Sequence, residues 1–419
     1  MLGIDLFNRT MRTWVLVSIL LVTLLGGACN RAESDMDENI KEECDMLDIK
    51  SVPYATEFAN YQKNSRVPVA TGAGGSILWA RQYTPTDICP VPVPSALYVG
   101  GGHIGIRMTG ELAFYDLNGE FKRSVTTGLG IPVVFGSSAV AYTRPSFLLE
   151  YSNYAGKLEL ELKSFPGLQD WTELLLFCPT SEEVLAAFQF TGGPGHSPRE
   201  YTVYRLPMET VLPEWTLNEK GTIEHALLSP DGEVIYVGRG AEILRLRSDD
   251  GTQQGNFSSG LTPLAAMSVS PEGNLVMIGT QVIEEDDQTR EQPILQVMDG
   301  EGKPLWSADL TSPRVNQPPA CGGDGRVFVI DSMMLTCFAA GEKQWEYELT
   351  YAQEPWLTVT ADDQVICLDN NEVTLLGAGG EEIFSVIITE EPEAFHLPVA
   401  LNGAGQLLIA GDKKLYCLN

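Results

Sequence analysis

Short apolar segments separated by polar turns recur along most of this chain. Residues 226–238 read ALLSPDGEVIYVG, and residues 267–279 read MSVSPEGNLVMIG. In each, an apolar strand leads through a turn rich in glycine and aspartate into a second apolar strand, which is the signature of a β-hairpin. Further copies lie at 320–331, 357–369 and 399–411, and weaker ones at 98–108, 133–142 and 175–188.

A third apolar strand follows each hairpin, and a fourth strand, which tends to carry an aromatic residue, often follows after another tight turn. Four strands in a repeat of about 40–45 residues is the pattern of a β-propeller blade. The sequence therefore predicts an all-β fold, a single β-propeller of eight four-stranded blades. Seven is the alternative number, because the second and third copies are degenerate. The aromatic residues of the fourth strands are Phe121, Trp215, Phe257, Trp306, Trp345 and Phe384.

The two ends of the repeat region complement each other. The last segment, Lys414–Asn419, is a third strand with no fourth strand after it, and Ser76–Gln82 is a lone strand that carries the expected aromatic, Trp79. We predict that these two segments pair. Such pairing closes the propeller through an N-terminal strand and removes the exposed sheet edges that favour aggregation.

The N-terminus has the features of an export signal. Arg9 and Arg12 precede Trp14–Leu25, an uncharged apolar run. This run is shorter than the roughly 20 residues that cross a bilayer as a helix. It has the length of the apolar core of a secretory signal peptide.

The apolar run ends in Gly26-Gly27-Ala28-Cys29, which resembles a bacterial lipobox. The resemblance implies that the Cys29 thiol is acylated and that residues 1–28 are a lipoprotein signal peptide, cleaved before Cys29. The match departs from the family pattern because Gly26 replaces the usual leucine. The alternative is an ordinary secretory signal cut nearby, with Cys29 as a plain thiol.

An acidic segment follows Cys29. Residues 30–48 contain eight carboxylates and two basic residues, with little apolar content. Such a segment cannot bury enough apolar surface to fold by itself. We therefore expect residues 29–65 to be a disordered tether and residues 66–419 to form the propeller.

Composition limits the partners of this protein. The 419 residues carry a formal net charge of −29, which argues against binding to nucleic acid phosphates. Hydrophobic residues make up 44%, so the body can bury a core. The acidity also argues against direct adhesion to anionic membranes, so we expect the N-terminal lipid to hold the protein at the membrane.

The repeats resemble those of a known family. LQVMDGEGKPLWSADL (295–310) and LTCFAAGEKQWEYEL (335–349) resemble the pyrroloquinoline-quinone-like propeller repeat, and the SPDG turns resemble WD40-like repeats. The resemblance implies that the tryptophans dock neighbouring blades. Among lipidated members, the chain is similar to the propeller lipoproteins of the outer-membrane β-barrel assembly machinery, which implies a scaffold without catalysis.

Signals for enzyme chemistry are few. The four histidines, His103, His196, His225 and His396, are not spaced as a metal pair, and no G-x-S-x-G, P-loop or H-E-x-x-H motif is present. The chain also lacks the adjacent cysteine pair of the quinone dehydrogenases. We expect no cofactor and no metal. Aspartates in the turns are expected to cap their own backbone: Asp231, Asp324, Asp362 and Asp363.

The cysteines do not define a disulfide framework. Eight are present, so seven remain if Cys29 is lipidated. Three of them, Cys337, Cys367 and Cys417, lie in predicted strands and are expected to be small buried apolar residues. A bond between Cys44 and Cys89 is an open alternative that spacing alone cannot decide.

Two long connections between second and third strands are the candidate partner-binding loops. They span residues 191–200 and 283–292 and are expected on the same face of the propeller. The alternative is that they are tolerated surface loops without function. The candidate binding residues are His196, Arg199, Glu284, Glu285, Asp286 and Asp287.

These features favour one function and leave a second open. We predict a non-catalytic lipoprotein of the bacterial envelope, at the outer membrane and facing the periplasm or the surface. Its monomeric propeller would serve as a scaffold that binds other envelope proteins. The alternative is an extracytoplasmic enzyme, quinoprotein-like or a hydrolase, with its active site in the central funnel.

Overall fold

The described part of the chain is built from β-strands in small antiparallel sheets. The computed structural model describes residues 67, 70–71, 74–83, 94–108, 110–127, 134–135, 139–143, 149–153, 158–162, 172–179, 183–190, 200–207, 213–285, 288–313, 318–351, 355–390 and 393–419. These residues form 32 strands in eight four-stranded sheets, so the predicted all-β class is confirmed. The predicted signal peptide, Cys29 and the predicted tether lie outside the described residues.

The first four sheets each contain four consecutive strands. The first is β2 (Ala96–Gly100), β3 (His103–Met108), β4 (Glu111–Asp116) and β5 (Phe121–Thr126). The second is β6 (Val134–Phe135), β7 (Ala139–Thr143), β8 (Leu149–Asn153) and β9 (Leu158–Leu162). The third is β10 (Thr172–Pro179), β11 (Glu183–Phe190), β12 (Glu200–Pro207) and β13 (Trp215–Lys220). The fourth is β14 (His225–Leu228), β15 (Val234–Arg239), β16 (Glu242–Arg247) and β17 (Gln253–Ser258).

Three more sheets repeat this order, and the last sheet departs from it. The fifth is β18 (Leu264–Val269), β19 (Leu275–Glu285), β20 (Gln288–Met298) and β21 (Pro304–Asp309). The sixth is β22 (Ala320–Cys321), β23 (Val327–Asp331), β24 (Met334–Ala339) and β25 (Glu342–Glu348). The seventh is β26 (Trp356–Val359), β27 (Val365–Asp369), β28 (Glu372–Leu376) and β29 (Glu382–Ile387). The last joins β1 (Ile77–Gln82) to β30 (Ala400–Leu401), β31 (Leu407–Ala410) and β32 (Lys414–Leu418).

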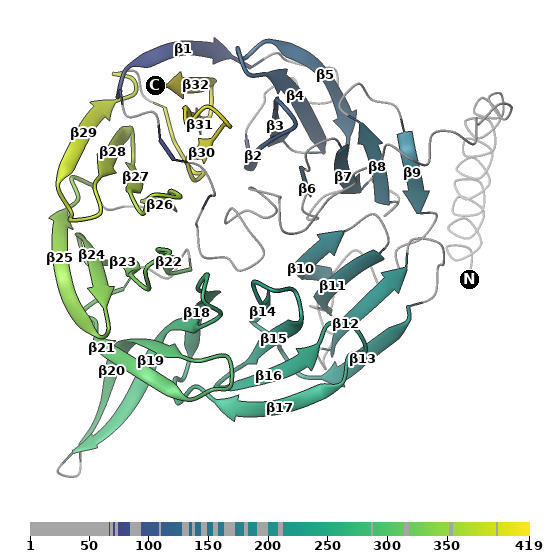
Figure 1. Cartoon of the computed structure of the whole chain (residues 1–419), viewed down its shortest axis with the longest axis vertical. Helices are drawn as coiled ribbons and strands as arrows, with labels where there is room; N and C mark the ends of the chain where they lie inside the picture. The colour runs from purple at the N-terminus through teal and green to yellow at the C-terminus, as the bar shows by residue number, and fades with distance from the viewer. Residues whose placement is uncertain are drawn as a thin grey trace, which may run out of the picture. The chain divides into compact units, whose positions relative to one another are not determined.

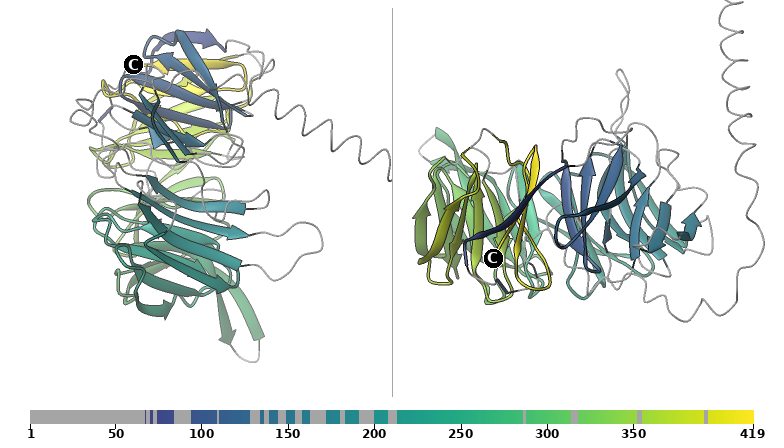
Figure 2. Two further views of the ribbon diagram at one scale, coloured as in Figure 1. Left: turned by 90° about the vertical axis from the view of Figure 1, so that its right-hand side faces the viewer. Right: turned by 90° about the horizontal axis from the view of Figure 1, so that it is seen from above.

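The last sheet contains both ends of the described chain. β1 pairs antiparallel with β32, from Ile77 opposite Leu418 to Gln82 opposite Lys414. The expected pairing of the N-terminal strand with the last segment is therefore present. Figure 1 shows the eight sheets around a common centre. The first strand is innermost in seven of them, and in the last sheet β30 is innermost and β1 outermost. Figure 2 shows these sheets from two further sides, with their strands running between the two faces.

Burial differs between inner and outer strands. All residues of β26 and β27 are buried, because the inner strands of a sheet are covered by the sheets on either side. The outer strands β21 and β29 instead alternate between exposed and half-buried positions. This difference explains why the first three strands of each repeat read as apolar runs and the fourth does not.

The half-buried positions of the outer strands hold the predicted aromatic residues, which contact glycines of the next sheet. A β carbon added at Gly380 would lie 2.6 Å from the ring of Trp345, and the Trp345 indole N–H donates to the carbonyl of Ala378 at 3.2 Å. Trp215 donates to the carbonyl of Ser248 in the same way, also at 3.2 Å. Equivalent glycine–aromatic contacts join Gly119 to Trp79, Gly251 to Trp215, Gly302 to Phe257 and Gly341 to Trp306.

A buried polar cluster follows β1. It lies at the end of the strands opposite the glycine-containing turns between third and fourth strands. The hydroxyl of Tyr83 donates to the carbonyls of Gly411 and Lys414, at 2.9 and 3.0 Å. The carboxylate of Glu393 accepts the backbone N–H groups of Lys413 and Lys414, both at 2.8 Å. These bonds attach the chain after β1 to the β31–β32 connection.

Candidate functional site

The connection between β19 and β20 is an extended two-stranded arm. Both strands have 11 residues, whereas the second strands of the other sheets have four to eight. The extra length lies at residues 281–285 and 288–292, which we call the β19–β20 arm. Figure 1 shows the arm projecting away from the ring of sheets.

This arm replaces one of the two predicted loops. Residues 283–292 were expected to form a loop, but the strand pairing continues to Glu285 opposite Gln288. The backbone of Glu284 and Glu285 therefore belongs to β19, whereas Asp286 and Asp287 lie outside the described residues. The β-branched residues Thr280, Val282 and Ile283 were a local signal for this extension.

The second predicted loop also joins a second strand to a third. β11 ends at Phe190 and β12 begins at Glu200, and these two residues are paired. The candidate residues His196 and Arg199 lie between them, outside the described residues. Both predicted connections thus start from the same end of their sheets, the end at which second strands finish.

The described side chains of the arm are largely exposed. Val282 has 49% of its surface exposed, and Gln281, Thr289, Arg290 and Glu291 are also exposed. The arm and its tip, residues 281–292, carry five carboxylates and a single basic residue. Because the arm projects from the sheets and its described side chains are exposed, it is the candidate binding surface among the described residues.

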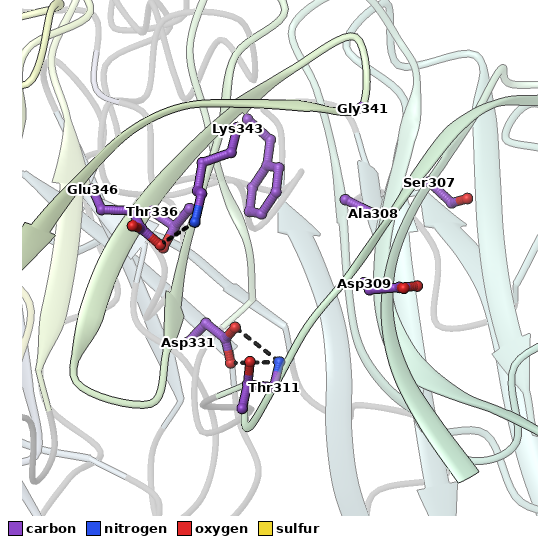
Figure 3. Close-up of a pocket in the computed structure, with 10 residues that line it drawn as sticks. Ser307, Ala308, Asp309, Thr311, Asp331, Thr336, Gly341, Lys343 and Glu346 are labelled. Atoms are coloured by element: carbon purple, nitrogen blue, oxygen red, sulfur yellow. Dashed lines mark hydrogen bonds and ion pairs between the residues drawn. The ribbon is translucent and has the colours of Figure 1, made fainter. Parts of the chain in front are cut away.

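A polar cavity of about 500 Å³ lies between two neighbouring sheets (Figure 3). Asp309 and Ser307 of β21 line one side, and Lys343 and Glu346 of β25 line the other. The Nζ of Lys343 lies 2.6 Å from the Oε1 of Glu346, so these two charges neutralise each other. Ten described residues line the cavity, and none of these ten is a histidine or a cysteine.

The remaining carboxylate of this cavity, Asp331, holds the chain between two sheets. It accepts the N–H groups of Thr311, at 2.9 Å, and Ser312, at 2.6 Å. Asp369 occupies the same position in the next sheet and accepts the N–H of Tyr351 at 2.7 Å. Because this arrangement recurs in the next sheet, we interpret Asp331 as a residue that holds the chain between two sheets, and we interpret the cavity as a seam between sheets.

Two described histidines lie next to backbone carbonyl groups, and a third, His396, is exposed. His103 Nδ1 lies 2.8 Å from the carbonyl of Gly101, and His225 Nε2 lies 3.4 Å from the carbonyl of Leu264. Within the described ranges, no group of three or more histidine, cysteine, aspartate or glutamate side chains is placed to hold a metal ion. Four described cysteines are buried free thiols: Cys321, Cys337, Cys367 and Cys417.

The turn aspartates make different contacts, and Asp362 accepts the hydroxyl of Thr360 at 2.6 Å. Asp231 accepts the N–H of Glu233 at 3.0 Å, and Asp324 accepts the N–H of Arg326 at 3.2 Å, so both cap their own turn as predicted. Asp363 instead accepts the N–H of Gly323 at 2.7 Å, in the turn of the neighbouring sheet. This aspartate joins two sheets, a role that the local turn pattern did not indicate.

Two other candidate features are a disulfide bond and a membrane-spanning helix. Cys44 and Cys89, the pair considered for a disulfide bond, are not among the described residues. No helix in the described part of the chain has the length and apolar character needed to cross a membrane.

Comparison with known proteins identifies the fold. No protein-family model matches the chain, and no curated protein matches it in sequence. The structure is similar to BamB from Moraxella catarrhalis, with a TM-score of 0.53 and 12% identity over 82% of this chain and 97% of that chain. It is also similar to the Pan2 WD40 domain from Neurospora crassa, with a TM-score of 0.46 and 11% identity over 84% of this chain and 97% of that domain. The fold is a β-propeller similar to that of BamB.

Proposed function

We propose that this chain is a lipid-anchored, non-catalytic scaffold of the bacterial cell envelope, at the outer membrane, and that its propeller binds another envelope protein. The lipobox-like sequence before Cys29 supports export and anchoring. The similarity of the fold to BamB supports a propeller placed among envelope proteins. The binding role itself depends on one observation, the exposed β19–β20 arm.

In this proposal the eight sheets are the blades of one closed propeller. The pairing of β1 with β32 supports closure, since it puts the first described strand in the last sheet. Contacts between β30 and β2 support it as well. A closed ring leaves no sheet without a neighbour, so every inner strand is covered on both faces.

The arm and the first described residues, Val67 and Thr71, lie at opposite ends of the strands. This arrangement supports separate roles for the two ends, one in partner binding and one in anchoring. Val67 donates its N–H to the carbonyl of Val359, the last residue of β26, at 2.8 Å. Thr71 donates its hydroxyl to Gln364 in the turn that follows, at 2.8 Å. The arm starts where second strands end, at the other end of the sheets. A tether that leaves from the face near Val67 would leave the arm accessible to a partner.

Deletion of the arm tests the binding role. Residues 281–292 are replaced by an Asn-Gly turn, which joins β19 to β20 at the length found in the other sheets. Affinity capture from solubilised envelope should then lose the partner that the wild-type chain retains. A matched control is Glu272→Ala, which changes an exposed residue at the other end of the same sheet. Equal capture of the partner by the wild-type and shortened chains would exclude the arm as the binding site.

Metabolic labelling tests the anchor separately. A palmitate analogue should label the wild-type chain in a bacterial host and should not label Cys29→Ala. Labelling of both chains to the same extent would exclude acylation at Cys29. This result would leave the binding role of the propeller untouched, since that role depends on the arm.

A further inference from the structure

No described strand pairs with the outer edges of the arm. Thr280 forms two backbone hydrogen bonds with the residues just before β18. Its N–H donates to the carbonyl of Pro263 at 3.1 Å, and its carbonyl accepts the N–H of Thr262 at 2.7 Å. On the other strand, the carbonyl of Pro293 accepts from Leu310 at 2.9 Å. Thr280 and Pro293 are opposite each other, so in this pair the backbone groups point away from the partner strand.

The alternation of an antiparallel ladder extends this orientation along the arm. Every second residue of a strand points its N–H and carbonyl to the same side. The backbone groups of Val282 and Glu284 therefore point outward from β19, and those of Thr289 and Glu291 point outward from β20. No described residue pairs with these four positions from outside the hairpin.

The β19 edge is the better candidate for binding. The pairing of β18 with β19 ends at Leu264 opposite Gly279. The described residues before β18 bond to Thr280, and none of them bonds to Val282. Val282 adds a half-exposed apolar side chain at this edge. Unpaired backbone groups next to an apolar side chain are the features to which an extended peptide binds by adding a strand.

Charge indicates which peptide fits. Residues 281–292 carry Glu284, Glu285, Asp286, Asp287 and Glu291 against Arg290, a net charge of −4, and the whole chain carries −29. Like charges on facing strands are destabilising, so a second copy of this arm is a poor partner. A strand that alternates basic and apolar residues would neutralise the carboxylates and cover Val282.

We propose that the β19 edge of the arm, at Val282 and Glu284, binds an extended basic segment of the partner protein by β-strand addition. This proposal rests on the binding role proposed above and specifies its mechanism. The partner strand would exchange backbone hydrogen bonds with Val282 and Glu284, in line with β18. Affinity would come from these bonds, and selectivity would come from the acidic arm.

Proline substitutions distinguish this edge from the rest of the arm. The N–H of Val282 is not used between β19 and β20, so Val282→Pro removes the edge donor and keeps the hairpin bonds. Pro293 already occupies the equivalent kind of position in the same ladder. Glu291→Pro makes the matched change at the β20 edge, and Val282→Thr changes the side chain while keeping the N–H.

The experiment measures binding of a labelled synthetic peptide of alternating lysine and valine to the full chain by fluorescence anisotropy. Val282→Pro should weaken binding about tenfold, as expected for the loss of an edge hydrogen bond and the obstruction by the ring. Glu291→Pro should stay within about twofold of wild type, which is within the scatter of a neutral surface change. Val282→Thr keeps the edge N–H and should weaken binding less than Val282→Pro does. A lysine–valine peptide interrupted by prolines, and a peptide of alternating glutamate and valine, should not bind.

Three results would overturn strand addition: no binding of the lysine–valine peptide, equal binding to Val282→Pro, or equal binding of the proline-interrupted peptide. The last result would mean that charge alone attracts the peptide. Loss of partner capture on arm deletion, combined with normal capture by Val282→Pro, would overturn strand addition and leave the proposed function standing. Normal capture after arm deletion would reject both.

Discussion

Gly119, in the turn between β4 and β5, lies against the indole ring of Trp79 on β1. A β carbon on Gly119 would lie 2.6 Å from the Cζ3 atom of Trp79, and the backbone of Gly119 has a φ of +75°. The glycine is therefore required twice, for its backbone conformation and for the space that the ring occupies. This contact joins the sheet that holds the first and last described strands to the first sheet of the chain.

Substitution of Gly119 by alanine should destabilise the fold. The β carbon would strain the positive φ and collide with Trp79, with an expected cost of about 2–4 kcal/mol in the free energy of unfolding. The matched control is Gly110→Ala. Gly110 has a φ of +74° and nothing within 4 Å of the added carbon. Its cost should be only about 1 kcal/mol from backbone strain. Urea unfolding followed by tryptophan fluorescence measures both, and equal costs would show that the contact with Trp79 is unimportant.

Alkaline pH should destabilise the protein through buried tyrosines. Burial, and then the nearby Tyr115 and Glu393, raise the pKa of Tyr83 well above its ordinary value of 10.0. The unfolded chain loses this proton near pH 10, while the folded chain retains it. The contribution is therefore complete below pH 10 and decreases as pH rises through the folded pKa, by at most about 1.4 kcal/mol per pH unit for one group.

Tyr83→Phe separates this effect from other alkaline effects. The variant loses the hydroxyl bonds to Gly411 and Lys414, so it should be less stable than wild type at pH 8. It should then lose less stability than wild type between pH 10 and pH 11. Urea midpoints measured across this range test the prediction, and parallel pH profiles would contradict it.

Removal of the Asp331 carboxylate should loosen the chain between β21 and β22. Asp331→Ala leaves the N–H groups of Thr311 and Ser312 without this acceptor, with an expected cost of about 1–3 kcal/mol. Asp309→Asn, on the exposed side of the same cavity, should change stability by no more than about 0.5 kcal/mol. Thermal unfolding of both variants distinguishes them, and a neutral Asp331→Ala would show that the loop is held by other contacts.

The described cysteines should be unreactive in the native protein. Burial raises the pKa of Cys337 to about 12 and that of Cys417 to about 11, and little thiolate forms at neutral pH. Cys321 and Cys367 are also buried. Labelling with a maleimide, followed by peptide mass spectrometry, should modify these four thiols in urea and not in buffer. Native labelling at Cys337 or Cys417 would show that their strands open.

Much of the fold could be predicted because its signals are local. Hairpins such as 226–238 contain both strands and their turn within a few residues, so apolar runs and glycine positions were sufficient to locate them. The outer aromatics, for example Trp345, were recognised from their regular position after a turn. The candidate site was predicted less well, since Glu284 and Glu285 belong to a strand and not to a loop.

The sequence by itself determined the all-β class, the four-stranded repeat and the aromatic position in each outer strand. These features follow from the alternation and turn chemistry of neighbouring residues. Only the tertiary structure decided that Trp79 meets Gly119, that Asp363 accepts the N–H of Gly323, and that no described strand pairs with the outer edge of the arm at Val282. The first two contacts join segments that are far apart along the chain, and the third feature depends on where the neighbouring strand stops pairing. A local sequence pattern contains neither kind of information.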